Sequence, residues 1–271
     1  MEYPHERFVA FEPGAGPEAA ARAFYEVMSL RRSVRAFSDR TVSRETIEWC
    51  VRAAGCAPSG AHKQPWRFVA VDEPQLKRRV REAAEHEERE FYARRANAKW
   101  LEDLAALETG PDKAFLETAP WLIAVFRLSS TDAGGQVYYA SESVGIAVGF
   151  LLAAIHHAGL VALTHTPSPM GFLRDVLGRP SNERAYLLIP VGYPAKGCTV
   201  PTLARKHLDE ILVWNAGDGT PSVPTRRDTS PVGDGGGDED TPSPQPSPPA
   251  GEREPEGTRG RGVMIRRRVG V

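Results

Sequence analysis

The sequence has little of what would indicate a disulfide framework, a nucleic-acid-binding face or a membrane span. Its 271 residues include three cysteines, Cys50, Cys56 and Cys198, an odd number at spacings that match no zinc motif, so ordinary buried thiols are expected. Lys and Arg total 34 against 35 for Asp and Glu, which excludes the strongly basic surface of a general nucleic-acid-binding protein. No run approaches the roughly 20 apolar residues that a spanning helix needs.

The composition is that of a globular protein, with 41% hydrophobic and 25% charged residues. Residues 1–17 carry acids and glycines rather than a basic segment followed by an apolar one, so no secretory signal is expected and the cytoplasm is the default location. Apolar segments fill residues 1–214, which are predicted to form one folded domain. Residues 215–271 are rich in Gly, Pro and charge, and they predict a disordered tail because they cannot bury enough surface to offset their ordering entropy.

Hydrophobic periodicity predicts an α+β fold with one sheet covered by helices. Helices are expected at 17–30, from an N-cap at Ser43, over 73–109 as more than one helix, and at 138–158. Strands are expected at 66–71, 121–126, 160–164 and 186–191, and residues 207–214 could form a last strand or an arm. The segment 138–158 is apolar on most sides, which indicates a helix buried in the core or at a subunit interface.

The first candidate functional motif is Arg31-Arg32-Ser33-Val34-Arg35, at the end of the first predicted helix. Arginines and a hydroxyl within five residues can grip a phosphate through charge-assisted hydrogen bonds. The same arginines could also do no more than complement the dipole at a helix C-terminus.

Three other segments stand at places where ligands are often held. Residues 57–66 form a Pro- and Gly-containing loop before a strand, residues 163–167 place two threonines around His165 at a strand end, and residues 202–206 bring two basic side chains after a proline. Taken singly, each could be an ordinary connection, and a lone histidine without an Asp or Ser partner is more often structural.

Together these segments resemble the nitroreductase superfamily, and within it the iodotyrosine deiodinase branch. The resemblance covers about residues 20 to 214 in collinear order. It is carried by five segments, namely Arg-Arg-Ser-Val-Arg at 31–35, Ala-Pro-Ser-Gly-Ala-His at 57–62, Val-Leu-Gly-Arg-Pro at 176–180, Pro-Val-Gly-Tyr-Pro at 190–194 and Thr-Val-Pro-Thr-Leu-Ala-Arg-Lys at 199–206.

The resemblance implies that the cofactor is FMN. It implies a phosphate site made by Arg31, Arg32, Ser33 and Arg205, with Arg35 close to the flavin ring. It places Pro58, Ser59 and Gly60 along the flavin, and Thr164 and Thr166 near the ring, with Thr166 as the catalytic residue that hydrogen-bonds flavin N5. The sequence Thr-His-Thr departs at His165 from the all-threonine version of the animal deiodinases.

The resemblance also implies a lid that binds the amino-acid part of a halotyrosine through Glu88, Tyr92 and Lys113, with the backbone N–H of Ala61 at the phenolate. The chemistry is consistent, because a zwitterion needs a carboxylate for its ammonium and cationic or hydroxyl donors for its carboxylate. Glu88 and Tyr92 are four residues apart, so they share a helix face. Taken without the resemblance, Glu88 belongs to a solvated charged run and Lys113 to a surface loop.

The function implied is FMN-dependent reductive dehalogenation of halotyrosines by an intertwined homodimer with a central mixed sheet covered by helices. Electrons would come from NAD(P)H or from a separate reductase. Animal members of the branch are membrane-anchored, and no anchor is recognised here, so a soluble homologue is expected. The alternatives are a general NAD(P)H-dependent nitro- or quinone reductase and a non-catalytic flavin-binding protein.

Overall fold

A computed structural model describes residues 3–215 of the chain, which divides into two units. The first unit ends at Ala204 and contains all the strands described below. The second begins at Arg205, and its described part holds one short 3-10 turn, η3 (Leu208–Glu210), in which the backbone N–H of His207 donates to Glu210 at 2.7 Å. Residues 207–214 therefore contain no strand, so of the two expected alternatives the last strand is wrong and the arm stays a prediction.

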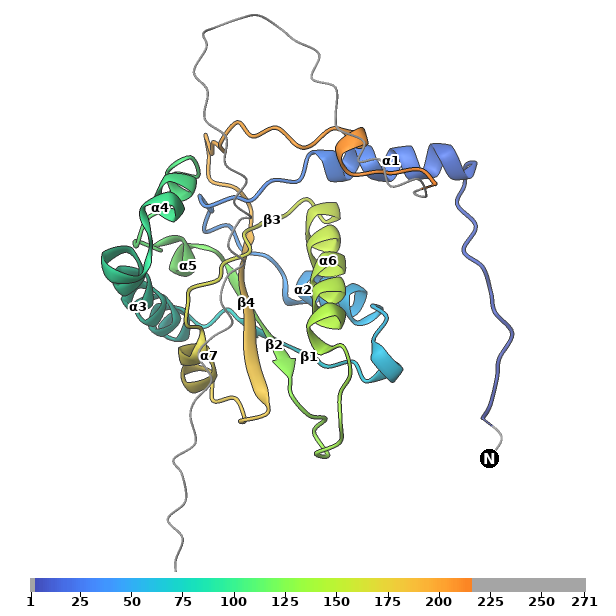
Figure 1. The fold of residues 1–271 in the computed structure, drawn as a ribbon, viewed down its shortest axis with the longest axis horizontal. Coiled ribbons are helices and arrows are strands. Elements are labelled where there is room, and N and C mark those ends of the chain that lie inside the picture. Colours follow the sequence, from blue (N-terminus) through green and yellow to red (C-terminus); the bar gives the residue numbers. More distant parts are fainter. Residues whose placement is uncertain (1–2, 216–271) are drawn as a thin grey trace, which may run out of the picture. The chain divides into compact units, whose positions relative to one another are not determined.

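The first unit is a four-stranded sheet between two layers of helices, as predicted (Figure 1). The strand order is β1-β2-β4-β3, and every neighbouring pair is antiparallel. The strands are β1 (Trp66–Val71), β2 (Trp121–Leu128), β3 (Val161–Ala162) and β4 (Glu183–Gly192). Among the described residues, the parallel pairing expected of a mixed sheet is confined to one isolated bridge, between Ser33 and Ala162.

One face of the sheet is covered by α2 (Arg44–Gly55) and α6 (Ala140–His157), with α1 (Pro17–Ser29) against α6. Their core includes Ile47, Ile123, Leu151 and Ile189, each at most 3% exposed. Ser43 caps α2 as predicted, because its side chain accepts a hydrogen bond from the backbone N–H of Thr46. The larger of the two apolar cores lies on this face.

The other face is covered by α3 (Pro74–Glu90), α5 (Phe115–Thr118) and α7 (Gly171–Val176). Val80, Leu116, Phe126 and Leu173 form its core and are nearly inaccessible to solvent. Helix α3 continues into a π-helical turn, η2 (Phe91–Arg95), and two extended residues separate this turn from α4 (Ala98–Ala105), which confirms that 73–109 contains more than one helix. The short helices α5 and α7 were not predicted.

Helix α6 has 18 residues of mean hydropathy 1.3, so by length and composition it is the one described helix that could cross a membrane. This is weak evidence, because a core helix passes the same test, and α6 packs on α2 and the sheet. Ile146 and Phe150 are each 43% exposed on its outer side.

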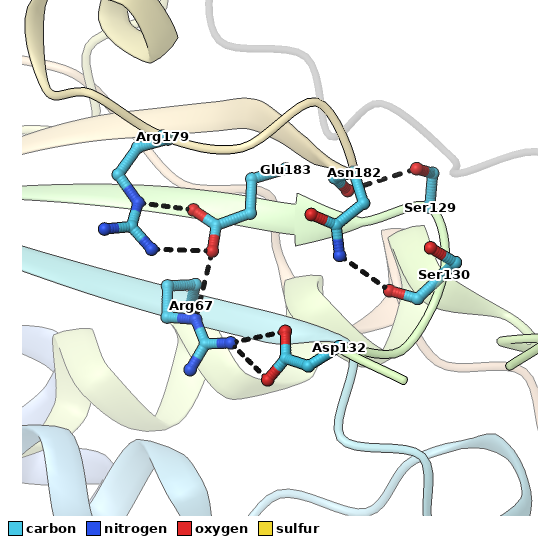
Figure 2. A network of polar contacts seen from close by, with 7 residues as sticks. All are labelled: Arg67, Ser129, Ser130, Asp132, Arg179, Asn182 and Glu183. Atoms are coloured by element: carbon cyan, nitrogen blue, oxygen red, sulfur yellow. Dashed lines mark hydrogen bonds and ion pairs between the residues drawn. The ribbon is translucent and has the colours of Figure 1, made fainter. Parts of the chain in front are cut away.

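A charged network connects the starts of β1 and β4 to the loop before α6 (Figure 2). Glu183 is 1% exposed and accepts hydrogen bonds from Arg179 at 2.7 and 2.8 Å and from Arg67 at 3.1 Å. Arg67 also donates hydrogen bonds to both carboxylate oxygens of Asp132, at 2.7 and 2.8 Å. Asn182 donates to the carbonyl of Ser130 in the same loop. The buried carboxylate is thus fully paired, which burial of a charge requires.

The strand expected over 160–164 is continuous only through β3, because Pro190 opposite Leu163 has no N–H to complete the pairing, which resumes in the same register between His165 and Leu188. Cys50 is buried and burial raises its pKa, whereas Cys56 is exposed, so the expectation of buried thiols is wrong for Cys56. The predicted disordered tail lies, apart from residue 215, outside the described residues.

Candidate active site

A cavity of about 170 Å³ opens on the side of the sheet covered by α3 and α5. Its lining combines charged, hydroxyl and aromatic side chains from separate parts of the first unit. They are Arg35, Glu88, Phe91, Tyr92, Trp100, Leu104, Thr109, Lys113, Phe115, Leu163, Thr164, His165, Thr166 and Ser168. Six residues named from the sequence therefore meet here, namely Arg35, Glu88, Tyr92, Lys113, Thr164 and Thr166.

Glu88 and Tyr92 reach the cavity from the end of α3 and the π-helical turn that follows it. Their spacing of four residues places both side chains on the same side of the continuous helix. Glu88 is 9% exposed, so it does not belong to a solvated run. The hydroxyl of Tyr92 donates to the backbone carbonyl of Thr109 at 3.1 Å.

Lys113 lies just before α5 and is 3% exposed, so the surface-loop alternative is wrong. Its backbone N–H donates to Glu85 at 2.9 Å, and Glu85 also pairs with Arg81 at 2.7 Å. Its Nζ lies 3.3 Å from Oε2 of Glu88 and donates to the carbonyl of Gly110. Glu85 and Arg81 thus hold the backbone from which Lys113 reaches Glu88.

The electrostatics of this pair reflect its burial. Burial raises the pKa of Glu88, and the nearby Lys113 partly offsets this. Burial lowers the pKa of Lys113, and Glu88 opposes that shift. Burial also raises the pKa of the Tyr92 hydroxyl. A buried ion pair contributes little net stability because both charges are desolvated, which favours exchange with a charged ligand.

The segment 164–166 runs beside β4, where the backbone N–H and carbonyl of His165 both bond Leu188 at 2.9 Å. Side chains alternate along such an extended segment. Thr164 and Thr166 are accordingly exposed on one side, and His165 is 7% exposed on the other. All three residues line the cavity, Thr164 and Thr166 as exposed residues and His165 as a buried one.

The arginine motif is placed next to these threonines by the sheet. The backbone N–H of Val34 donates to the carbonyl of Ala162 at 3.2 Å, beside the parallel bridge from Ser33 to Ala162. The bridge is isolated, and Arg35, two residues after Ser33, lines the cavity together with Thr164.

Arg31 and Arg32 line a second cavity, of about 210 Å³, between the start of the motif and the end of α6. The guanidinium of Arg32 donates to the carbonyl of Pro201. Arg205 belongs to the second unit, so its part in a phosphate site stays a prediction.

The loop that carries Pro58, Ser59, Gly60 and Ala61 lies away from the first cavity, beside the start of α6. A Cβ on Gly60 would stand 2.8 Å from the carbonyl oxygen of Tyr138, so only glycine fits there. Ala61 has φ 47°, an uncommon value for alanine that turns the backbone sharply. Within one chain, the structure does not bring this loop to Glu88 and Lys113.

Sequence reasoning missed four apolar lining residues, Phe91, Trp100, Leu104 and Phe115. The rings of Phe91 and Trp100 meet edge to face, with centroids 4.9 Å apart. Two aromatics near the end of a charged helical segment were the available signal. They make the outer wall of the cavity apolar, which suits a ring-bearing ligand. Among residues 3–215, no cluster of three or more metal-ligating side chains occurs.

The helix-covered antiparallel sheet and the cavity define an α+β protein with a site for a small charged ligand, next to an arginine-rich segment that can hold a phosphate. The family comparison is specific: the model of the nitroreductase family matches residues 28–193. The chain belongs to the nitroreductase family.

Similar proteins point to one branch of this family. The chain is 54% identical over 215 residues to the iodotyrosine deiodinase of Haliscomenobacter hydrossis, covering 75% of this chain and 97% of that protein. It is 47% identical over 198 residues to iodotyrosine deiodinase 1 of Rattus norvegicus, covering 71% and 70%. The crystal structure of oxidized iodotyrosine deiodinase bound to FMN and 3-iodo-L-tyrosine matches with a TM-score of 0.63 at 31% identity, covering 72% of this chain and 100% of that one.

Proposed function

We propose that this protein is an FMN-dependent enzyme that removes halogen reductively from halotyrosines, converting iodotyrosine to tyrosine and iodide. The observation that carries the proposal is the convergence of Glu88, Lys113 and Tyr92 on a cavity whose other wall presents Thr164 and Thr166. This set is complementary to a free amino acid bound beside a flavin. The iodotyrosine deiodinases to which the chain is 44–54% identical support the same reaction.

Glu88 would receive the ammonium of the substrate, and Lys113 with Tyr92 would receive its carboxylate. In the structure Nζ of Lys113 lies 3.3 Å from Oε2 of Glu88, so the two charges already face the position that a zwitterion would occupy. The ammonium then replaces Lys113 at Glu88 while the carboxylate replaces Glu88 at Lys113. Two ion pairs form for one that opens, and the neighbouring Phe91 and Trp100 exclude water from them.

FMN is the proposed cofactor, because Arg31 and Arg32 line one cavity while Arg35, Thr164 and Thr166 line another. Arg31, Arg32, Ser33 and, from the second unit, Arg205 would hold the phosphate, Arg35 would lie near the ring, and the Thr166 hydroxyl would donate to flavin N5. Thr164 would stand beside it. Bound FMN supplies the two electrons that, with one proton, replace the halogen by hydrogen and release halide. NAD(P)H or a separate reductase would return electrons to the cofactor.

We also propose that the working form is an intertwined homodimer, because one chain leaves the site incomplete. The loop 58–61 would line the flavin from a second copy and present the Ala61 N–H to the substrate phenolate. Exposed apolar side chains support an interface on α1 and α6. They include Phe24, Tyr25, Leu30, Ile146 and Phe150, each at least 43% exposed. A cytoplasmic location is part of the proposal, and the free thiols of the described residues are compatible with it.

The test is a single turnover with variants. FMN in the purified protein is reduced without oxygen, 3-iodotyrosine is added, and tyrosine and iodide are measured. Stoichiometric tyrosine is expected. With the rate of this turnover measured over a range of substrate concentrations, Glu88→Gln should raise the half-saturating concentration of 3-iodotyrosine by about 10- to 100-fold, because hydrogen bonds between charged groups contribute about 1.5–3 kcal/mol. Glu82→Gln is the matched control, since Glu82 is exposed on the same helix.

A general nitro- or quinone reductase would behave differently. It would reduce a neutral nitroarene, yield no tyrosine from 3-iodotyrosine, and respond alike to Glu88→Gln and Glu82→Gln. That pattern would refute the dehalogenase proposal. A protein that binds FMN and turns over neither compound would be a flavin-binding protein without this activity.

A further inference from the structure

Among residues 3–215, Nε2 of His165 is the buried side-chain nitrogen or oxygen left without a hydrogen-bond partner. Such atoms are uncommon, because an unpaired buried polar group costs free energy. The ring lies edge-on to Phe115, with centroids 6.0 Å apart, and lines the cavity with Glu88 and Lys113. The unpaired nitrogen therefore points toward the part of the site that would bind the amino acid.

The two oxygens of Glu88 face different partners. Oε2 lies 3.3 Å from Nζ of Lys113, and Oε1 lies 3.8 Å from Nε2 of His165. The second distance is too long for a hydrogen bond, but a movement of less than about 1 Å would form one. His165 thus stands behind the carboxylate on the side that Lys113 does not use.

We infer that His165 is a positioning residue for Glu88: its Nε2–H binds Oε1 when Lys113 is displaced from Oε2, and so aims Oε2 at the ammonium of the substrate. This inference rests on the proposed function and names a residue through which the amino-acid end is selected. Among the described residues, Lys113 is the cationic side chain within 4 Å of Glu88, and once the zwitterion displaces it, the Nε2–H of His165 would keep the carboxylate in the rotamer that faces the ammonium.

A neutral imidazole suits this role. Burial, together with the nearby Lys113 and Arg35, lowers the pKa of His165 to about 3, so the ring is uncharged at neutral pH. A neutral imidazole donates from one nitrogen. It can therefore hold a carboxylate without adding another positive charge beside Lys113, Arg35 and an incoming ammonium. A lysine or arginine at this position would compete with the substrate for Glu88.

The test compares two ligands that differ by the ammonium group alone. These are 3-iodotyrosine and 3-(4-hydroxy-3-iodophenyl)propanoate, and their Kd values are measured on the oxidised FMN-loaded protein from changes in flavin absorbance. His165→Leu removes the donor and keeps an apolar side chain of similar size. His165→Gln keeps an N–H donor. FMN content and melting temperature confirm that each variant is folded.

His165→Leu is expected to weaken 3-iodotyrosine about 10- to 100-fold, the effect of losing a hydrogen bond to a charged group, and to leave the propanoate within a few-fold of its original Kd. His165→Gln should restore most of the affinity for 3-iodotyrosine. Equal weakening of both ligands would show a merely structural role and overturn the inference. So would unchanged binding of both.

The same measurement separates this inference from the proposed function. If the unmodified protein binds the two ligands equally, the ammonium is not recognised, and the amino-acid site fails together with the role of His165. If the unmodified protein prefers 3-iodotyrosine and His165→Leu keeps that preference, the proposed function stands and the inference about His165 is wrong.

Discussion

His165 should make the stability of the fold depend on pH in a definite direction. Its pKa is about 3 in the folded protein against an ordinary value of 6.5, because the ring is buried and faces Lys113 and Arg35. Below pH 6.5 the unfolded chain therefore binds a proton that the folded chain does not. The stability is complete above pH 6.5 and declines as the pH falls toward the folded pKa.

The magnitude follows from the difference between the two states. At pH 5 the unfolded histidine is about 1.5 pH units below its ordinary pKa and is protonated, whereas the folded one is not. Each pH unit of this difference favours the unfolded state by about 1.36 kcal/mol. The folded protein should lose about 2 kcal/mol, which lowers the melting temperature by about 4–8 °C for a domain of this size.

The assay is thermal unfolding of the FMN-loaded protein at pH 7.5 and pH 5, followed by circular dichroism. The drop in melting temperature should be about 4–8 °C larger in the unmodified protein than in His165→Gln, because glutamine does not titrate. His86→Gln, at an exposed position on α3, should behave as the unmodified protein does. Equal drops in the unmodified protein and His165→Gln would refute the assignment of His165 as a buried neutral group.

Three other outcomes are expected. Glu183→Gln should lower the free energy of unfolding in urea by about 2 kcal/mol at pH 7, since Arg179 and Arg67 lose a charged partner. Arg179 lowers the pKa of Glu183, so this loss should shrink as the pH falls below the ordinary carboxyl range. A loss that does not depend on pH would contradict the ion pairing. Gly60→Ala should destabilise the protein by about 1–3 kcal/mol, because the new Cβ would clash with the backbone oxygen of Tyr138. Gly55→Ala, where a Cβ would have nothing within 4 Å, should not destabilise it. Equal urea unfolding midpoints would show that the loop moves to accommodate the methyl group. Affinity for 3-iodotyrosine should fall as the pH drops through the raised pKa of Glu88, beginning above the ordinary carboxyl range, and Glu88→Gln should remove this dependence in a titration of flavin absorbance.

Local sequence signals were sufficient for most elements. The N-cap at Ser43, the alternation in β1 and the apolar run in β2 predict structures that form where expected, because each depends on neighbouring residues. The helices α5 and α7 escaped prediction because four and six residues are too few to show a helical period. The strand expected over 160–164 is interrupted after Ala162, because Pro190 of β4 has no N–H to offer Leu163, and the pairing resumes at His165.

The candidate site depended more on the resemblance than on pattern. Taken alone, Glu88 looks like part of a charged surface and Lys113 like a loop lysine. Their burial comes from packing of α3 and α5 on the sheet, which no local pattern reports.

Local amino-acid patterns and the family resemblance were enough to indicate the helix-covered sheet and the types of side chain available for a flavin and an amino acid. Which of these side chains meet depends on the packing of the folded chain. This packing brought Glu88 and Lys113 within 3.3 Å, turned His165 behind the carboxylate, and left the loop 58–61 beside α6. The physical reason is that these contacts join residues far apart in the chain, so they are set by how the two helical layers pack on the sheet rather than by the preferences of neighbouring residues.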